Sequence, residues 1–299
     1  MSTSLKKAGL YVGLTFLVSY LLIGLYLAFG GKWVMPGSLI VTIGYMFVPM
    51  TVAIAVQKTI YKQPVRGPLG VSFRLNRWFL VAWLLPPLIA MATLGTSLLS
   101  PAVEFSPEMT GLFERFKSAL TPEQFQQMER QTALLPIHPF WLGLAQGLVA
   151  GPTINAVAGF GEELGWRGLL QKELSRLGFW KSSAVIGIVW GLWHAPIILQ
   201  GHNYPQHPVE GVAMMTAFTV LLAPIFSYIR LKTKSVIAAA ILHGSLNATA
   251  GLAVSVIKGG DDLTTGMTGL AGFIVLAVVN IAILVHRGYN HASRNEALT

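Results

Sequence analysis

Residues 235–257 read SVIAAAILHGSLNATAGLAVSVI and contain no Asp, Glu, Lys or Arg. A helix needs about 20 predominantly apolar residues to cross the hydrocarbon core of a bilayer, and this stretch is long enough. His243 and Asn247 lie inside it and are strongly polar. The stretch therefore predicts a membrane-spanning helix that carries polar side chains to membrane depth.

Seven further apolar windows of similar length occur in the chain, which makes eight with residues 235–257. The seven are 8–29, 34–57, 78–100, 139–161, 181–200, 209–229 and 267–286. The 299 residues are 53% hydrophobic and 11% charged, against about 45–50% and 25% in soluble domains. This composition excludes a water-soluble globular fold. We predict an all-α, polytopic membrane helical bundle of about eight transmembrane helices with a polar cavity, forming a single membrane domain over residues 1–299.

The basic residues predict the orientation of the bundle. When the windows alternate across the membrane, sixteen of the 21 Lys and Arg residues fall on one side. The other five are Lys32, Arg115, Lys117, Arg130 and Lys258. By the positive-inside rule, both termini are expected in the cytoplasm of a multi-pass cell-membrane protein. The net charge of +9 is then explained by orientation and by contact with the lipid bilayer, and it requires no nucleic-acid partner. The chain has no cysteine, which excludes a cysteine nucleophile and disulfides.

Two segments do not fit a simple span. At 1.5 Å per residue, 139–177 would form a helix about 58 Å long, too long for one crossing. We expect a break at Gly151-Pro152 and at Gly159-Phe160-Gly161, with residues 162–177 at the cytoplasmic side. In segment 101–138, Ser106-Pro107-Glu108 and Thr121-Pro122-Glu123 predict the starts of two short surface helices.

Few ionisable residues remain at membrane depth, where a charge is costly and is usually functional. They are Glu162, Glu163, Arg167, His194 and His243. Glu163 and Arg167 are four residues apart, so they face each other on one side of a helix and can neutralise each other. Glu162 lies about 100° away around the helix, which leaves its carboxylate available for chemistry.

Two other pairs share the spacing of four. His243 and Asn247 could donate hydrogen bonds toward one point, as an oxyanion requires. Trp190 and His194 place an aromatic ring beside an imidazole. Amide hydrolysis needs a base that activates water and donors for the developing negative charge, and this set supplies both. The remaining histidines are interpreted as ordinary surface residues: His138, His202, His207, His286 and His291.

Three motifs together resemble a known family. Residues 162–167 match E-E-x-x-x-R, residues 190–194 match F-x-x-x-H with Trp in place of Phe, and residues 243–247 match H-x-x-x-N. In this order, over about residues 155–255, they resemble the CPBP family of intramembrane glutamate proteases. That family includes type II CAAX prenyl endopeptidases, bacteriocin-processing proteins and abortive-infection proteins.

The resemblance implies an eight-helix membrane fold with a water-filled cavity reached from the cytoplasmic side, and cleavage without a metal or other cofactor. It implies that Glu162 and His194 hold and activate the attacking water. His243 and Asn247 would form the oxyanion site, and Glu163 with Arg167 would support it. Trp190, where the family usually has Phe, would alter the shape of the pocket.

The resulting hypothesis is an intramembrane endopeptidase whose catalytic core is 139–257 and whose substrate is a membrane-associated peptide or protein, prenylated or otherwise hydrophobic. Three alternatives remain. The Glu and two His residues could bind a catalytic zinc ion; the fold could serve a non-enzymatic immunity or scaffold protein; or the polar residues could form a proton relay in a transporter. The substrate and the oligomeric state stay open.

Overall fold

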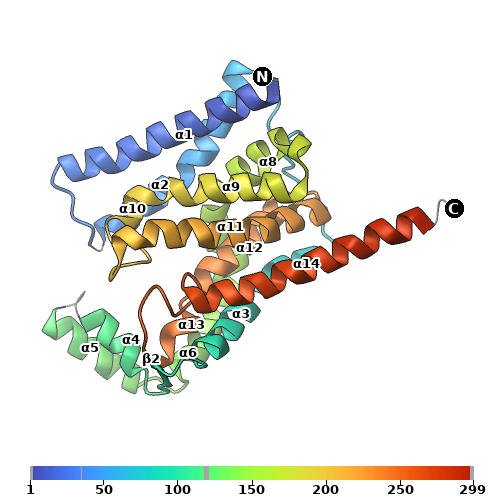
Figure 1. The fold of residues 1–299 in the computed structure, drawn as a ribbon. Helices are drawn as coiled ribbons and strands as arrows, with labels where there is room; N and C mark the ends of the chain where they lie inside the picture. The colour runs from blue at the N-terminus through green and yellow to red at the C-terminus, as the bar shows by residue number, and fades with distance from the viewer. Residues whose placement is uncertain (1–2, 35, 118–120, 297–299) are drawn as a thin grey trace.

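The computed structural model describes residues 3–34, 36–117 and 121–296 as a bundle of α-helices (Figure 1). The long helices form where the apolar windows lie, which confirms the all-α fold class. Their bounds are α1 Thr3–Ala28, α2 Gly37–Ala55, α3 Arg77–Ser97, α9 Phe179–Trp193, α11 Pro208–Thr233, α12 Val236–Thr249 and α14 Leu270–Glu296.

Six helical segments are long and apolar enough to cross a membrane, among the residues that the structure describes. They are Thr3–Ala28, Gly37–Ile60, Arg77–Ser97, Pro208–Thr233, Val236–Ser255 and Leu270–Gly288. The longer bounds include the π-helix η1 (Val56–Ile60) and the short helix α13 (Leu252–Ser255). The windows 139–161 and 181–200 are also helical, but each is divided between consecutive segments. The chain is a polytopic membrane protein.

The outer helices present apolar side chains away from the bundle. On α1, Leu17, Leu21 and Leu25 are exposed, and on α14 Ile274 and Val278 are exposed. Rows of exposed aliphatic residues at helical spacing are unfavourable in water and favourable against lipid chains. These faces of α1 and α14 are therefore the lipid-facing surfaces of the bundle.

The long segment after residue 138 is a chain of short helices that change register. Its parts are α6 Pro139–Ala150, the π-helix η2 Gly151–Asn155, α7 Ala156–Glu163, the π-helix η3 Leu164–Leu170, α8 Gln171–Glu173 and the 3₁₀-helix η4 Ser175–Leu177. The predicted break at Gly151-Pro152 is confirmed as the π-helical turn η2. The predicted break at Gly159-Phe160-Gly161 is wrong, because α7 runs through it and the next change of register begins at Leu164.

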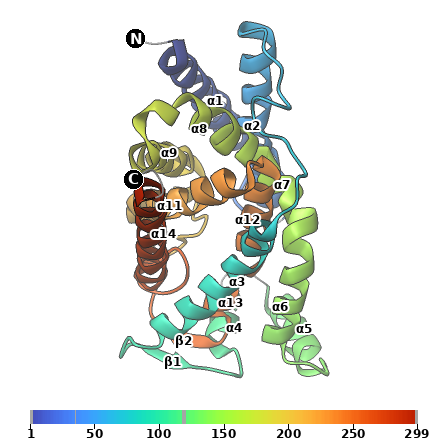
Figure 2. The same ribbon diagram turned by 90° about the vertical axis from the view of Figure 1, so that its right-hand side faces the viewer.

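The glycines in this segment allow close packing. A Cβ at Gly159 would lie 2.9 Å from the carbonyl oxygen of Ala240 in α12. A Cβ at Gly161 would lie 2.7 Å from the carbonyl oxygen of Met46 in α2. On the α12 side, a Cβ at Gly244 would overlap the backbone at Gly151. Gly159 and Gly244 thus allow the backbones of α12 and of the segment η2–α7 to approach closely, and Gly161 does the same for α7 and α2, as small residues permit between membrane helices. Figure 2 shows α6 and α7 running beside α12.

Segment 101–138 forms a small cap at one end of the bundle. It contains α4 (Thr110–Lys117) and α5 (Pro122–Ala133), which confirms the two predicted short helices. Thr121 and Gln124 form a reciprocal capping box at the start of α5. The strand β1 (Val103–Phe105) pairs antiparallel with β2 (Ile257–Gly259), a contact that the sequence did not predict (Figure 2).

The two ends of the bundle differ in what they carry. In Figure 1 the N-terminus of α1 and the C-terminus of α14 lie toward the right, together with α8. The short helix α10 (Ala195–Ile198) and the β1–β2 cap lie toward the left. The C-terminal ends of α11 and α14, with Arg230 and Arg287, belong to the end that carries the termini. We call this the terminal end and the other the cap end.

Candidate active site

The sequence-predicted polar residues come together from three parts of the chain. Glu162 and Glu163 are the last residues of α7, and Arg167 follows within η3. Trp190 lies in the last turn of α9, and His243 is in the middle of α12. Because α12 packs closely against α7, residues about 80 positions apart in sequence become neighbours.

Glu163 is the centre of a buried network. Both of its carboxylate oxygens lie 3.0 Å from Nη1 of Arg167, in the predicted i,i+4 pair. Its Oε1 also lies 2.8 Å from Nδ1 of His243. Glu163, Arg167 and His243 are 0%, 1% and 4% exposed. A buried carboxylate with two partners of this kind holds both of them in place, because each would otherwise be left unpaired.

Arg167 is also held by two aromatic rings. Its guanidinium carbon lies 4.4 Å from the ring centroid of Trp190 and 4.4 Å from that of Phe226. Stacking of this kind suits a delocalised guanidinium, which is less strongly hydrated than an ammonium group. Phe226 comes from α11 and was not predicted to contribute, since nothing in its own sequence neighbourhood marks it.

Glu162 has a different set of partners. Its Oε2 accepts hydrogen bonds from Nε1 of Trp190 at 2.8 Å and from Nε1 of Trp166 at 3.4 Å. Its Oε1 lies 3.7 Å from Nε2 of His243, beyond ordinary hydrogen-bond distance. One oxygen is therefore fixed by two indoles while the other is oriented toward the imidazole. Trp190 is the departure from the family motif, and its indole supplies a hydrogen bond that Phe could not make.

In both histidines the protein holds the ring through Nδ1. Nδ1 of His194 lies 2.8 Å from the carbonyl oxygen of Trp190, and since a carbonyl only accepts, this nitrogen carries the proton. In a neutral ring, Nε2 of His194 is then an acceptor. Nδ1 of His243 faces the Glu163 carboxylate, so it too is the protonated nitrogen, and Nε2 is turned toward Glu162.

A cavity of about 430 Å³ adjoins these groups. Glu162, His194, His243 and Asn247 all line it, together with aromatic and aliphatic side chains. Glu163 and Arg167 are not among the lining residues. The four residues assigned to direct chemistry thus line one cavity together with the supporting residue Trp190, and Glu163 and Arg167 lie outside its lining. Asn247 is accessible within this cavity, one helical turn beyond His243.

The cavity extends toward the cap end of the bundle. Its lining includes His202 and Asn203, before α11, and Met267 and Thr268, before α14. The resemblance implied a cavity reached from the cytoplasmic side, and the charge pattern placed both termini on that side. These two expectations conflict, because the loops that line the cavity are at the end opposite to the termini (Figure 1).

Several contributors at the site were missed by reasoning from the sequence. Trp166 lies inside the E-E-x-x-x-R motif, four residues after Glu162, and that spacing could have shown its indole facing the carboxylate. Tyr45 lines the cavity from α2, and its ring centroid lies 4.4 Å from that of Trp193. His202, interpreted as an ordinary surface residue, instead lines the cavity, and burial lowers its pKa to about 4.

His207 was also interpreted as an ordinary surface residue, and in the structure it is partly exposed and has an acidic partner. Its Nδ1 lies 2.6 Å from Oδ1 of Asp262, and the hydrogen bond with this carboxylate raises the pKa of His207 above its ordinary value. The other oxygen of Asp262 accepts from the backbone N–H of Gln206 at 2.7 Å. The loops before α11 and α14 are therefore joined at the cap end of the cavity.

A metal-binding arrangement was one of the alternatives. Within residues 3–34, 36–117 and 121–296, no group of three or more His, Asp and Glu side chains is placed so that it could hold a metal ion. Glu162 and His243 instead face each other directly, and His194 makes its hydrogen bond to a backbone carbonyl.

The fold and the site define a class: a polytopic membrane protein with buried Glu, His and Arg side chains beside a cavity at membrane depth. Residues 140–249 match the family described as type II CAAX prenyl endopeptidase Rce1-like. This match confirms the resemblance drawn from the three motifs.

A curated relative is CAAX prenyl protease 2 of Methanococcus maripaludis. It is 37% identical over 93 residues, which make up 29% of this chain and 34% of the relative. The alignment thus spans about a third of the length of that protein.

Proposed function

We propose that this protein is an intramembrane endopeptidase in which Glu162 and His194 activate a water molecule for attack on a peptide bond. The observation that carries the proposal is the cavity that Glu162, His194, His243 and Asn247 all line, with Glu163 and Arg167 holding His243 from outside the lining. The family of residues 140–249 and the name of the archaeal relative support a protease. We assign the catalytic core to 139–257.

In the proposed reaction, Oε1 of Glu162 accepts a proton from water while the water oxygen bonds to the carbonyl carbon of the substrate. His194 Nε2 accepts the second hydrogen bond of that water and orients it. The carbonyl π electrons move to oxygen, where His243 and Asn247 donate hydrogen bonds. When the C–N bond breaks, the proton held by Glu162 passes to the leaving amine, so that the carboxylate is restored.

The role of His243 sets a requirement on its protonation. Its Nδ1 proton is committed to Glu163, so Nε2 can donate to an oxyanion only when the ring carries both protons. The two carboxylates beside the ring would balance the charge of that form. Glu163 therefore has a task beyond pairing with Arg167, because it orients His243 through Nδ1.

The substrate class follows from the lining of the cavity. Its walls carry Met46, Met215, Phe218, Leu222 and Leu246 beside the polar groups. Such a surface suits a hydrophobic peptide segment or a peptide with an attached hydrocarbon chain. We propose a membrane-associated substrate of this kind and the bilayer as its reservoir.

The basic residues at the terminal end support an orientation in the cell membrane with both termini in the cytoplasm. The cavity would then open toward the non-cytoplasmic side. The absence of native cysteine makes single-cysteine labelling direct. Gln131→Cys, in α5, should react with an impermeant maleimide added to intact cells, and Phe73→Cys, between η1 and α3, only after permeabilisation. The reverse pattern would contradict this orientation and return the cavity to the cytoplasmic side.

The proposed function is tested by comparing membrane peptides from cells with and without the protein. Peptides cleaved by the wild type should persist uncleaved with Glu162→Gln, and Glu210→Gln, an exposed carboxylate at the start of α11, should behave as the wild type. Unchanged cleavage with Glu162→Gln would reject the proposal. If cells with Glu162→Gln kept the cellular phenotype of the wild type although no peptide was cleaved, the immunity or scaffold alternative would be favoured.

Zinc dependence is the competing mechanism. The purified protein should keep its activity after dialysis against a chelator. If activity were lost and returned only when zinc was added, Glu162, His194 and His243 would be reassigned as ligands. Flux of a substrate across liposomes without hydrolysis would instead favour a transporter.

A further inference from the structure

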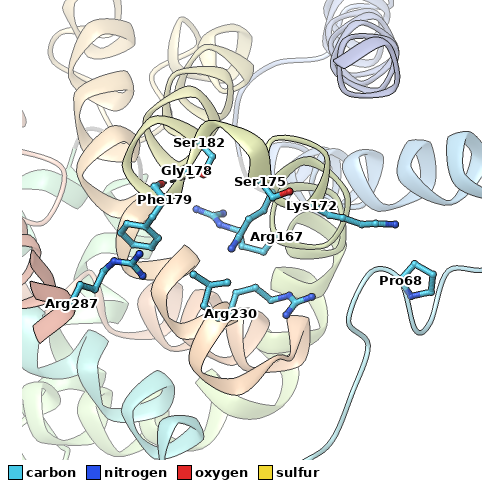
Figure 3. A pocket seen from close by; sticks show the side chains of 11 residues that line it. Pro68, Arg167, Lys172, Ser175, Gly178, Phe179, Ser182, Arg230 and Arg287 are labelled. Carbon is cyan, nitrogen blue, oxygen red and sulfur yellow. Dashed lines mark hydrogen bonds between the residues drawn. The ribbon is translucent and has the colours of Figure 1, made fainter. Parts of the chain in front are cut away.

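A second pocket, of about 380 Å³, lies at the terminal end of the bundle and does not belong to the active-site cavity. Its lining carries four cationic side chains from four different elements: Arg167 of η3, Lys172 of α8, Arg230 of α11 and Arg287 of α14. Figure 3 shows Arg167 between the other cations, with Arg287 beside Phe179 on one side and Lys172 extending on the opposite side.

The charge of this pocket is poorly balanced by the protein. Among the lining residues that the structure describes there is no carboxylate. Arg167 is paired with Glu163, but through Nη1 alone. In the described part of the chain, Arg230, Lys172 and Arg287 form no ion pair with a carboxylate, and Arg287 stacks on the ring of Phe179 at 4.1 Å. Three positive charges therefore remain without a counter-ion.

Unused hydrogen-bond donors point to the same conclusion. Nε and Nη2 of Arg167 are buried without a hydrogen-bond partner, and so is Nε of Arg230. Arg167 as a whole is 1% exposed. A buried donor without an acceptor is unfavourable, and native structures almost always satisfy it with protein, water or ligand. Nε and Nη2 of one guanidinium form the fork that receives two oxygens of a single anion.

We propose that this pocket binds a phosphate group, with Arg167 and Arg230 as the principal ligands and Lys172 and Arg287 as additional cations. Guanidinium groups match the oxygens of phosphate in two-point contacts, and Lys adds a point charge. The volume accommodates the group with a substituent attached. The phosphate can belong to a lipid headgroup at the membrane surface or to a soluble molecule, and both sources present the same oxygens.

The pocket is connected to the active site through one side chain. Arg167 holds Glu163 with Nη1, and Glu163 holds His243. An anion on the free edge of Arg167 would fix the guanidinium from the other side. The binding site itself does not depend on the proposed protease activity, so it can be tested without a substrate.

The test measures binding to the full-length protein in neutral detergent by thermal shift and by calorimetric titration. Inorganic phosphate is compared with acetate and chloride at equal ionic strength, and nanodiscs containing phosphatidylglycerol are compared with nanodiscs of phosphatidylcholine alone. Stabilisation by inorganic phosphate indicates a soluble ligand, and stabilisation by phosphatidylglycerol alone indicates a lipid headgroup. Either result supports the site, provided that the variants below lose it.

Arg230→Gln should weaken that binding at least tenfold, and Lys172→Gln, which removes an additional cation, should weaken it by a smaller but measurable factor. Lys172 is exposed, so Lys172→Gln is expected to fold normally. It therefore keeps the test valid even where Arg230→Gln fails to fold. Arg74→Gln removes the same charge from an exposed position outside the pocket and should bind as the wild type. Equal binding by Lys172→Gln and Arg74→Gln, equal stabilisation by acetate, or no stabilisation by either phosphate source would overturn the proposal.

Discussion

The active-site cavity and the basic pocket are lined by different residues and are joined through the Glu163–Arg167 pair. The cavity contains a carboxylate, two imidazoles and an amide between apolar walls, and the N–H groups of Trp190 Nε1 and His194 Nδ1 are already engaged by protein acceptors. The pocket contains four cations with donors left over. Arg167 takes part in both regions, because it pairs with Glu163 through Nη1 and lines the basic pocket with Nε and Nη2 unpaired.

The most damaging way to break this arrangement is to remove Arg167. Arg167→Gln leaves Glu163 buried beside one partner, and removal of one member of a buried pair costs about 3–5 kcal/mol. The loss should be seen as a lower free energy of unfolding in a detergent denaturation series. The double variant Glu163→Gln/Arg167→Gln should recover part of the loss, because no lone charge remains. Stability equal to the wild type in Arg167→Gln would show that the pair does not connect the two regions.

A smaller effect is expected from Trp190→Phe, which restores the usual family residue. The change removes the 2.8 Å hydrogen bond to Glu162, and a hydrogen bond to a charged group contributes about 1.5–3 kcal/mol. Thermal unfolding should show the decrease, whereas Trp141→Phe, at an exposed position in α6, should change stability little. Equal effects of the two substitutions would mean that the indole of Trp190 does not hold the carboxylate.

The spacing between α7 and α12 determines whether the cavity wall can form. A Cβ at Gly244 would overlap the backbone of the preceding segment, whereas a Cβ at Gly251 meets nothing within 4 Å. Gly244→Ala should therefore lower the free energy of unfolding by about 1–3 kcal/mol, and Gly251→Ala should not. If both variants unfold at the wild-type temperature, the helices are free to separate.

The smallest effect concerns the loops at the cap end of the cavity. The pKa of His207 is raised in the folded protein by Asp262. Its contribution is complete below the ordinary pKa of about 6.5 and is lost as the pH rises through the higher folded value. Hydrogen exchange at the amide of Gln206, corrected for base catalysis, should accelerate over that interval. His207→Gln should remove the pH dependence, and a persistent dependence would assign it to another group.

The sequence was most informative where one helix decides the geometry. Glu163 and Arg167 meet because they are four residues apart, and His243 and Asn247 both line the cavity for the same reason. It was less informative about contacts between helices. The hydrogen bond between Glu163 and His243 depends on how closely α7 and α12 approach, which glycines at 151, 159 and 244 allow.

Other parts of the structure could not be read from local patterns. Lys172, Arg230 and Arg287 of the pocket were interpreted only as markers of orientation, because their place beside Arg167 depends on how the ends of four elements come together. The pairing of β1 with β2 joins residues about 150 positions apart. The π-helical segment that begins at Leu164 contains no proline that would predict it, whereas the one at Gly151–Asn155 contains Pro152.

The central claim is that Glu162 activates the water that cleaves the peptide. It is tested most directly by the initial rate of cleavage in proteoliposomes containing purified wild type, Glu162→Gln or the control Glu210→Gln. A general base contributes about 10²–10⁴-fold to such a rate. The account predicts a loss in this range for Glu162→Gln, with peptide affinity and thermal stability close to wild type and full activity for Glu210→Gln. Cleavage by Glu162→Gln at the wild-type rate would contradict it.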